Sequence, residues 1–506
     1  MSLARVASFT LDGVAARHVW VEADVRSGLP AFAVVGLADK AVREARERVR
    51  AAVTNAGYAF PNGRITVNLA PAYLRKIGPG FDLPLAIAII AAAGEIGRDS
   101  LAGTALVGEL SLNGEVRAIR GALAIAEAAR ARGIPRLVVP RNRAREAALV
   151  REVTVVGVEE LQETVEVLRG QREPAPIPEA EAGEPEPADE PDLRDVRGHN
   201  GLIPALEVAA AGGHNLFLHG PPGTGKTMLA RRLPGLLPPL TPQEAIEVTR
   251  LHSVAGLHGG DGLIERRPFR APHHTISAAG LVGGGPGPAP GEATLAHHGV
   301  LFLDELSEFT RPALEALRQP LEDGHVTIVR AQRVMVFPTR ITLVAASNPC
   351  PCGLGEASCR CSAADLARHQ RRLSGPLLDR IDVSVTVARP SANALRTQAA
   401  PASAELRPRI LAARERQTAR LAGTGLTCNA QLTVRLLREA GHVTGSAQRL
   451  LYELHDRNRL SARGHGRILR VARTVADLDG DTEVKPNHIL RAASLRLDDQ
   501  ALALAA

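Results

Sequence analysis

One short segment constrains the fold of this chain more than any other. Residues 220–227 read GPPGTGKT, which fits the pattern G-x-x-x-x-G-K-[ST]. The apolar stretch 215–219 before it predicts a strand, and 228–236 after it predicts a helix. The pattern requires this context, because its glycines let backbone N–H groups wrap a phosphate at the start of a helix. The segment therefore predicts a nucleotide-binding α/β domain, and a chance glycine-rich turn is the disfavoured alternative.

The residues of this loop have separate expected roles. Lys226 is expected to reach the β- and γ-phosphate oxygens of ATP, and the Thr227 hydroxyl is expected to bind Mg²⁺. The backbone of the other residues would surround the phosphates. The predicted ATP-binding residues are Gly220, Pro221, Pro222, Gly223, Thr224, Gly225, Lys226 and Thr227.

A strand-like run that ends in two acids follows further along the chain. Residues 301–305 read LFLDE. Alone, such a run is common and can simply be a strand that ends in solvent. Downstream of a phosphate-binding loop, it predicts a strand that delivers carboxylates to Mg²⁺ and ATP. We expect Asp304 to hold Mg²⁺ through water and Glu305 to polarise the attacking water, because hydrolysis is slow without a general base in reach.

Two further residues complete the predicted ATP site. The strand-like run 341–348 ends in Asn348, whose amide could hold the attacking water or the γ-phosphate. Arg380 lies in GPLLDRID (375–382), at the predicted end of a helix. In a ring it could reach the γ-phosphate of a neighbouring subunit. Chemistry alone equally allows Arg380 a surface ion pair.

An acidic, proline-rich segment divides the chain. Residues 172–192 carry six Pro and no apolar periodicity, so they predict an extended tether. Apolar runs alternate with amphipathic stretches before it, which predicts an α/β domain. From about residue 403, strand signals end and helical patterns follow one another. We expect an N-terminal domain at 1–172, a linker at 173–192, a nucleotide-binding core at 193–395 and a helical domain at 396–506.

Composition bears on partners and location. Eight of the 54 acidic residues lie between Glu173 and Asp192, so the rest of the chain carries 61 bases against 46 acids. That balance permits binding to phosphate backbones, although all but four of the bases are Arg, as a GC-rich genome would also produce. The longest apolar run, from Leu83 to Gly94, is too short to span a bilayer, and no secretory signal is readable. We expect a cytoplasmic protein without a membrane partner.

Four of the five cysteines fall within twelve residues, at Cys350, Cys352, Cys359 and Cys361. Four thiolates in a glycine-containing loop suit a tetrahedral Zn²⁺, although C-x-C spacing is tighter than the usual C-x2-C knuckle. Unligated thiols are the alternative, and a disulfide is disfavoured in a reducing cytoplasm. Four protein ligands would leave no position for water, so we expect a structural zinc.

The order of these motifs resembles a known family. Together with APHHTIS (271–277), GPLLDRID (375–382) and LSARGHGRILRVARTVADLDG (460–480), it resembles the magnesium-chelatase-like AAA+ ATPases of the ComM (YifB) competence type, over nearly the whole chain. The resemblance implies that Arg380 is an arginine finger and that Arg463 is a second sensor arginine from a helical lid. It also implies a hexameric DNA translocase that assembles with ATP and acts in branch migration during natural transformation.

The same resemblance implies a β-hairpin before the Asn348 strand and an insertion near the second helix of the core. The hairpin would span 325–337, with Arg330 and Arg333 at its tip, and the glycine-rich segment 277–292 would be a mobile pore loop. We expect the two arginines to contact DNA. The alternative is that they only solvate the edge of a hairpin.

The N-terminal part resembles a Lon-protease-type domain, notably in 107–140. The position of the nucleophilic serine reads Gly80, and that of its lysine partner falls at Leu123. A Ser–Lys dyad needs a hydroxyl and an amine in contact, so we expect no peptidase activity and a role in assembly or partner binding.

Two other functions are open at this point. The chain could be the ATPase subunit of a magnesium chelatase that acts on a porphyrin-binding partner, or a protein-remodelling unfoldase. The Lon-like domain and the four-cysteine loop favour the DNA motor over the first. The second is disfavoured because 277–292 has no clear counterpart of the aromatic pore residue of unfoldases. The pairs His273–His274 and His297–His298 are a weak signal for another metal in a chain with 16 His.

Overall fold

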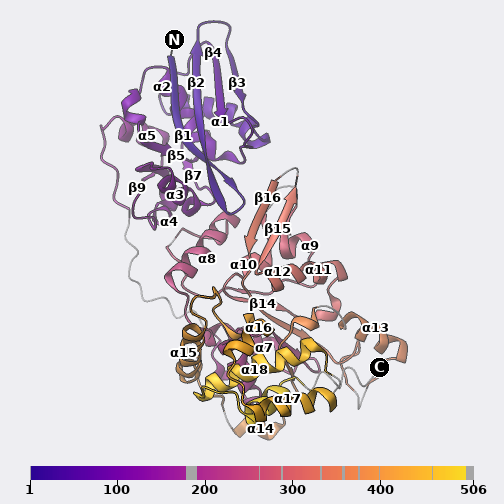
Figure 1. Ribbon diagram of the computed structural model, residues 1–506. Coiled ribbons are helices and arrows are strands. Elements are labelled where there is room, and N and C mark those ends of the chain that lie inside the picture. Colours follow the sequence, from indigo (N-terminus) through magenta and orange to yellow (C-terminus); the bar gives the residue numbers. More distant parts are fainter. Residues whose placement is uncertain are drawn as a thin grey trace. The chain divides into compact units, whose positions relative to one another are not determined.

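A computed structural model describes residues 2–177, 191–260, 262–285, 289–330, 333–355, 359–373, 377–397, 399–457 and 460–496. Residues 178–190 of the predicted linker thus lie outside the described residues. The chain forms two compact units (Figure 1). The first holds Met1–Glu186 with Pro242–Ile264 and Val329–Phe337, and the second holds the rest of the chain. No helix among the described residues is long and apolar enough to cross a lipid bilayer.

The first unit is built on a seven-stranded sheet in the order β3-β4-β2-β1-β5-β8-β9. Strand β2 runs antiparallel to both of its neighbours, and the other strand pairs are parallel. Asp12 and Ala15 pair across a two-residue turn in which Gly13 has a φ of 67°, so β1 and β2 form a hairpin. The strands are β1 (Ser2–Asp12), β2 (Ala15–Arg26), β3 (Ala31–Val35), β4 (Arg64–Ala70), β5 (Thr104–Leu106), β8 (Arg136–Pro140) and β9 (Thr154–Val158), beside a small ladder of β6 (Glu109–Leu110) and β7 (Val116–Arg117).

Helices of two kinds pack on this sheet. In α2 (Asp82–Ala92) every residue is buried, which agrees with its almost wholly apolar sequence. In α1 (Lys40–Asn55) the buried residues Val42, Ala45, Val49, Ala52 and Val53 lie on one face, as an amphipathic helix requires. The unit also contains α3 (Ala122–Ala131), α4 (Arg141–Ala147) and α5 (Leu161–Leu168).

The segment 242–264 follows the phosphate-binding helix in the chain but belongs to the first unit. Its helix α8 (Pro242–Ala255) packs against α3, and Ile246 adjoins the apolar cluster there. Arg250 Nη1 lies 3.2 Å from Glu127 Oε2. The Ser253 hydroxyl donates to the buried carboxylate of Glu146. Apolar and polar contacts therefore both attach this insertion to the N-terminal domain.

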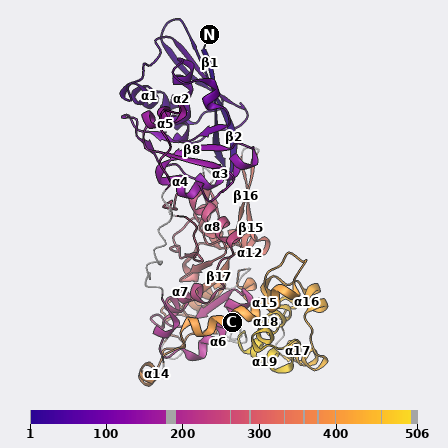
Figure 2. The ribbon, with the colours of Figure 1, turned by 90° about the vertical axis from the view of Figure 1, so that its left-hand side faces the viewer.

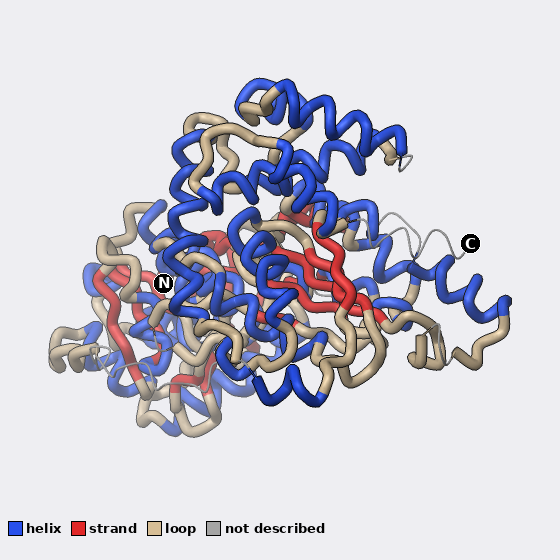
Figure 3. Tube along the Cα trace, turned by 90° about the horizontal axis from the view of Figure 1, so that it is seen from below, coloured by secondary structure: helices blue, strands red, loops and turns tan. Residues whose placement is uncertain are grey.

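The second unit contains a five-stranded parallel sheet in the order β11-β14-β17-β10-β18, flanked by helices (Figure 3). Every residue of β14 and β17 is buried, as expected for a parallel sheet covered on both faces. The carboxyl ends of the five strands share one edge, where α/β sheets bind ligands. The strands are β10 (Leu216–His219), β11 (Phe269–Arg270), β14 (Val300–Leu303), β17 (Thr342–Ser347) and β18 (Val383–Thr386); the helices are α6 (Ile203–Gly212), α7 (Lys226–Leu236), α9 (Ala278–Val282), α10 (Glu292–Leu295), α11 (Arg311–Ala316), α12 (Arg318–Asp323) and α13 (Ala363–Leu373).

The predicted run of C-terminal helices is confirmed, and no strand follows β18 in the described part of the chain. The helices from α15 to α19 lie together in Figure 2, with α18 largely buried among them. The carboxylate of Asp477 on α18 accepts hydrogen bonds from Arg420, Asn429 and Arg473. These helices are α14 (Ala392–Thr397), α15 (Ser403–Arg420), α16 (Val434–Ala440), α17 (Gly445–Arg457), α18 (Ala462–Asp479) and α19 (Pro486–Ser494).

Candidate functional site

The loop between β10 and α7 has a backbone that favours glycine. Gly223 and Gly225 have φ angles of 72° and 90°, in the left-handed region. A Cβ on Gly220 would lie 2.2 Å from the carbonyl oxygen of Val387, so no side chain fits there. The predicted strand, loop and helix are confirmed, and the helix begins at Lys226, slightly earlier than predicted.

The side chain of Lys226 is nearly buried beneath this loop. Its amine donates hydrogen bonds to the carbonyl oxygens of Gly220 (2.6 Å) and Pro221 (2.8 Å), and to Asn348 Oδ1 (3.1 Å). Burial lowers the pKa of Lys226, and the two acids at the end of β14 oppose that shift. Lys226 and Asn348, predicted separately from the sequence, therefore lie at one site.

Thr227 and Asp304 are also brought together, as predicted. Thr227 Oγ1 donates a hydrogen bond of 2.7 Å to Asp304 Oδ2, and the backbone N–H of Glu305 donates to Asp304 Oδ1 at 3.0 Å. Hydroxyl and carboxylate oxygens are ligands that Mg²⁺ prefers. The donor set fits a Mg²⁺ site in which Thr227 and Asp304 would both be ligands.

Glu305 has a left-handed backbone, with φ and ψ both 52°, which is sterically unfavourable for a residue with a side chain. It lies between β14 and the short helix η5 (Leu306–Glu308), and its side chain is 52% exposed. Glu305 Oε2 lies 3.4 Å from Nδ1 of His274. In the sequence, His274 stood out only as part of the 271–277 motif and of a histidine pair, and neither signal placed it beside Glu305.

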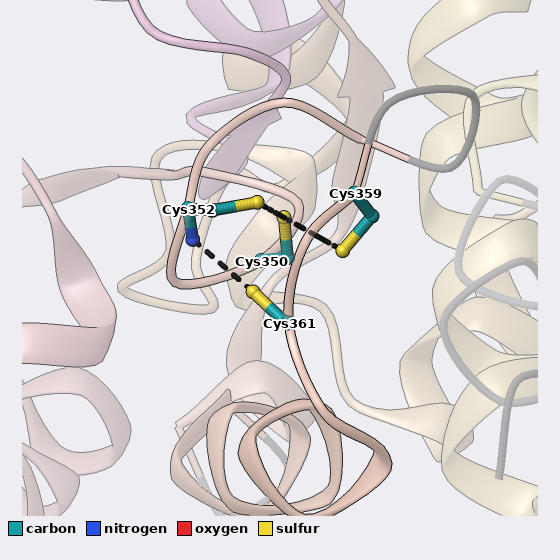
Figure 4. Close-up of side chains that lie close together, drawn as sticks. All are labelled: Cys350, Cys352, Cys359 and Cys361. Carbon is teal, nitrogen blue, oxygen red and sulfur yellow. Dashed lines mark hydrogen bonds between the residues drawn. The ribbon is translucent and has the colours of Figure 1, made fainter.

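The four-cysteine loop begins two residues after Asn348. The Sγ atom of Cys350 lies 3.3 Å from that of Cys352 and 3.7 Å from that of Cys359, and the backbone N–H of Cys352 points to Cys361 Sγ at 3.3 Å (Figure 4). One ligand atom from each cysteine lies within 4.8 Å of the others. A tetrahedral site with Zn–S bonds of about 2.3 Å has sulfur atoms about 3.8 Å apart, so the four thiols fit zinc.

All five cysteines are free thiols. Hydrogen bonds from the backbone N–H groups of Arg360 and Leu354 lower the pKa of Cys352 to about 6, whereas burial raises the pKa of Cys361 to about 12. Cys352 is therefore the thiol most readily deprotonated for metal binding. The loop also touches the phosphate-binding loop. Gly353 has a φ of 75°, and a Cβ there would lie 2.8 Å from Cδ of Pro222. Nothing in the sequence indicates this contact between the two loops.

Arg380 and Arg463 have different acidic partners, and the partner of Arg463 is the residue that precedes Arg380 in the chain. Arg380 ends the short helix η6 (Leu378–Arg380), and its side chain is 9% exposed and pairs with Glu322. Arg463 is in the first turn of α18, which the Ser461 hydroxyl caps by accepting from Gly464 N. The Arg463 side chain is 66% exposed, and its Nη1 lies 3.2 Å from Asp379, beside Arg380.

The predicted hairpin is confirmed as β15 (His325–Arg330) and β16 (Arg333–Pro338). Arg330 ends the first strand and Arg333 begins the second, but their side chains and residues 331–332 lie outside the described residues. Met335 is buried and lies about 3.5 Å from the position of a Cβ on Gly13, within the first unit. Three apolar side chains of the hairpin are exposed: Val329, Val334 and Val336.

The predicted loop 277–292 contains regular structure. It holds α9 and the two-stranded ladder of β12 (Gly283–Gly284) and β13 (Ala289–Pro290), while 286–288 lie outside the described residues. The difference has a local cause, because the Ser277 hydroxyl caps α9 by accepting from Gly280 N. In the N-terminal domain, Gly80 lies in a short turn of helix and Leu123 is buried, so these positions provide neither a hydroxyl nor an amine.

Comparisons with known proteins agree with this architecture. Residues 192–395 match the family described as magnesium chelatase, subunit ChlI; residues 21–143 match subunit ChlI of Mg-chelatase; and residues 400–496 match the C-terminal part of that subunit. An uncharacterized protein of Mycobacterium tuberculosis is 46% identical over 499 residues, 98% of this chain and 99% of that protein. YifB of Escherichia coli is 40% identical over 511 residues, 99% of this chain and 98% of YifB. Competence protein ComM of Haemophilus influenzae is 42% identical over 506 residues, 98% of both chains. The chain therefore belongs to the ComM/YifB family of magnesium-chelatase-like proteins.

Proposed function

We propose that this protein is an ATP-hydrolysing ring motor that translocates DNA and promotes branch migration of recombination intermediates during natural transformation. The observation that carries the proposal is the convergence of Lys226, Thr227, Asp304 and Asn348 at one edge of the parallel sheet. This convergence supports ATP hydrolysis. The 42% identity to a competence protein along nearly the whole chain supports a role in transformation.

The residues of the site would divide the work of hydrolysis. Lys226 would exchange its carbonyl and amide partners for the β- and γ-phosphate oxygens, and Thr227 and Asp304 would hold Mg²⁺, which offsets phosphate charge when bound. Glu305 would accept a proton from the attacking water, and Asn348 would orient that water or the γ-phosphate.

The remaining arginines would act at the contacts between subunits. We propose that six copies assemble with ATP, that Arg380 leaves Glu322 to reach the γ-phosphate of the neighbouring copy, and that Arg463 senses the nucleotide from the helical lid. An arginine from a neighbour makes hydrolysis depend on assembly. The Arg463 side chain is exposed, which supports a change in its conformation when nucleotide binds. Arg380 is paired with Glu322, so it would have to exchange that carboxylate for the γ-phosphate.

DNA would pass the hairpin tip at Arg330 and Arg333. The basic balance of the chain outside its linker supports binding to phosphates. The four-cysteine loop would hold a structural zinc, which the separations between its sulfur atoms support.

A second function has a specific observation in its favour. All three family matches carry the name of a magnesium chelatase subunit. The alternative is therefore an ATPase subunit whose hydrolysis drives a porphyrin-binding partner. The same ATP site would serve both functions, so the effector of hydrolysis distinguishes them.

The deciding experiment measures the ATPase rate of the full chain without effector, with single-stranded DNA, with four-way junctions and with protein clients. Stimulation by junctions is expected. The motor proposal fails if no DNA changes the rate and a protein partner does.

Two variants assign the activity to this site. Lys226→Ala is expected to lose tight nucleotide binding, whereas Glu305→Gln should bind ATP but barely hydrolyse it, because anchoring charge and water activation are separate roles. Nucleotide affinity and turnover are measured for each. Equal turnover in Glu305→Gln and the parent would remove Glu305 from the mechanism.

A further inference from the structure

We propose that His214 is a positioning residue that ties the segment bearing Arg380 to helix α18; this inference rests on the proposed ATPase function. The His214 ring lies within the second unit, at the start of β10, and has a partner at each nitrogen. Its Nδ1 atom is 3.0 Å from Oδ2 of Asp382, which lies two residues after Arg380. Its Nε2 atom is 2.7 Å from Oγ1 of Thr474 on α18.

The two contacts of His214 are buried hydrogen bonds. The side chains of His214 and Thr474 are fully buried, and Asp382 is 6% exposed. Burial would raise the pKa of Asp382, but the hydrogen bond with His214 and the charge of Arg470 hold that pKa below its usual value. The ionised carboxylate can only accept, so Nδ1 of His214 donates to it. Because a buried charge that loses its partner is costly, the contact with Asp382 is firmly held.

The residue after His214 fixes the backbone beside Arg380. Nδ2 of Asn215 donates a hydrogen bond of 2.8 Å to the carbonyl oxygen of Arg380. The carbonyl oxygen of Asn215 accepts from the backbone N–H groups of Asp382 (3.1 Å) and Val383 (3.0 Å). Two consecutive residues therefore hold the segment 380–383 through its backbone and through the Asp382 side chain, so a shift of His214 would displace the backbone of Arg380.

Helix α18 continues from the His214 contact to Arg463. Thr474 lies eleven residues after Arg463, which is about 16 Å along the helix axis. At the Arg463 end, α18 meets the Arg380 segment through the exposed pair of Arg463 and Asp379. Exposed ion pairs contribute little to stability. The buried contact at His214 is thus the firmer of the two, and it would keep α18 and the Arg380 segment in register when Arg463 moves toward nucleotide.

Gly212, the last residue of α6, leaves room for the contact between His214 and Thr474. A Cβ at position 212 would lie 2.2 Å from Nε2 of His214 and 2.7 Å from Oγ1 of Thr474. Both distances are shorter than a van der Waals contact, so a side chain at position 212 would displace the ring. Gly212→Ala therefore breaks the contact without removing a polar group.

The test uses mixed rings in which one kind of subunit hydrolyses ATP and the other supplies the arginine finger. Arg380→Ala subunits keep a working nucleotide site, and Lys226→Ala subunits keep Arg380. Thr474→Val is introduced only into the Lys226→Ala subunits, because valine has the shape of threonine but no hydroxyl. We expect kcat of the mixture to fall about tenfold with KM almost unchanged, since a displaced arginine impairs the chemical step in its neighbour.

Conservative changes show whether the hydrogen bond itself matters. In the same Lys226→Ala subunits, Thr474→Ser restores the hydroxyl and should restore kcat, whereas Gly212→Ala should reproduce the loss. Thr418→Val is the matched control, since the Thr418 hydroxyl donates to the carbonyl oxygen of Arg414 within α15, and it should leave kcat unchanged. Melting temperature and assembly are measured for every variant.

A further pair of variants tests His214 directly. His214→Asn keeps a donor near the Nδ1 position for Asp382 but does not reach Thr474, so it should lower kcat as much as Thr474→Val does. The double variant should lose no more than either single variant, because both changes break one contact. Additive losses would mean that the two residues act separately, which would overturn the proposal.

Other outcomes also decide the matter. A mixture with Thr474→Val that keeps the parental kcat but melts at a lower temperature would leave His214 with a purely stabilising role. An equal loss with Thr474→Ser would exclude the hydroxyl as the cause. If the parent protein hydrolyses no ATP under any condition, the proposed function fails. If the unmodified mixture is active and Thr474→Val matches it, only this inference fails, and if no mixture is active, this inference fails together with the assignment of Arg380 to its neighbour.

Discussion

Lys226 and Arg380 are both nearly buried cations, but their partners differ. The amine of Lys226 binds two carbonyl oxygens and one amide oxygen, all of them neutral. Arg380 pairs with the carboxylate of Glu322. A charge with neutral partners gains most from an incoming phosphate, whereas a paired charge must first give up its partner. In the proposed ATP-binding role, Lys226 would give up no charged partner, whereas Arg380 would first have to separate from Glu322.

This contrast leads to a prediction for Arg380. Arg380→Ala should abolish ATPase activity in assembled rings, because the neighbour would lose the charge that stabilises its transition state. Mixing Arg380→Ala with Lys226→Ala subunits should restore partial activity, since each change spares one face of the shared site. Activity is measured across mixing ratios, with assembly followed by size-exclusion chromatography. If both variants assemble and no mixture hydrolyses ATP, Arg380 does not act on its neighbour.

Single residues could be predicted where the pattern that identifies them lies within a short stretch of sequence. Lys226 and Thr227 belong to one continuous motif, and Asp304 follows a recognisable apolar run, so the sequence predicts them. His274 lies near Glu305 because of the register of two parallel strands, which no spacing along the chain encodes. The contact of Gly353 with Pro222 escaped prediction for the same reason.

At the scale of elements, the four-cysteine loop lies beside two parts of the proposed ATP site. It follows Asn348 in sequence, and Gly353 packs against Pro222 of the phosphate-binding loop. In addition, Nε2 of His369 on α13 lies 3.0 Å from the carbonyl oxygen of Asn348. The loop is therefore placed to support both the nucleotide loop and the Asn348 strand end.

We predict about one Zn²⁺ per chain, and a loss of ATPase activity when it is removed. A double change of Cys350 and Cys352 to Ser should release the metal, because a structural site holds its loop through all four ligands. Metal content and ATPase rate are measured together. Cys428→Ala is the matched control, since it removes a buried cysteine outside the loop. Purified protein without zinc would contradict the prediction. Normal ATP hydrolysis after loss of zinc would mean that the loop does not support the proposed ATP site.

The hairpin supports a second prediction at this scale. Changing Arg330 and Arg333 to Ala should weaken DNA binding and make it less dependent on salt. Each lost phosphate contact reduces the slope of the logarithm of the binding constant against the logarithm of the salt concentration by about 0.7 to 0.9. ATP affinity should be unchanged. Junction affinity at two salt concentrations tests this. Unchanged affinity and unchanged stimulation by DNA would leave these arginines with a purely structural role.

Elements were predictable where periodicity and motif agreed. The strand before the phosphate-binding loop and the hairpin were predicted near their observed bounds, and the run of C-terminal helices was predicted to begin near residue 403, where α15 begins. The stretch 277–292 was wrongly predicted to be a loop because it is rich in glycine, although a short helix, capped by Ser277, lies within it. The resemblance implied an insertion near the second helix of the core, but nothing in the sequence indicated the surface on which α8 packs.

At the scale of the whole molecule, the division of the sequence at the linker differs from the division of the fold into two compact units. The acidic linker separates the halves in sequence, yet 242–264 lies in the unit formed by the N-terminal half. This segment follows α7, which begins at Lys226. The chain therefore has a second, noncovalent attachment between its halves, made by α8 on α3.

We predict that the halves stay together after the linker is cut. A protease site inserted within 178–190 should yield two fragments that co-elute on size-exclusion chromatography, because α8 remains bound to the N-terminal domain. Arg250→Glu should weaken this association, and adding Glu127→Arg should restore it by reversing the ion pair. Separate elution of the parental fragments would contradict the prediction. An uncut sample of each variant controls for folding.

The packing of α8 on α3 also affects how such a protein can change over generations. Suppose that recombination between two related genes exchanges the coding sequence up to the linker. The product would then carry the N-terminal half of one protein and the α8 of the other. Ser253 would then meet a surface without the Glu146 carboxylate, and Ile246 would lose its apolar neighbours. Inherited changes on α3 and α8 must therefore be compatible, and a lineage that lost the first half would be expected to lose 242–264 with it.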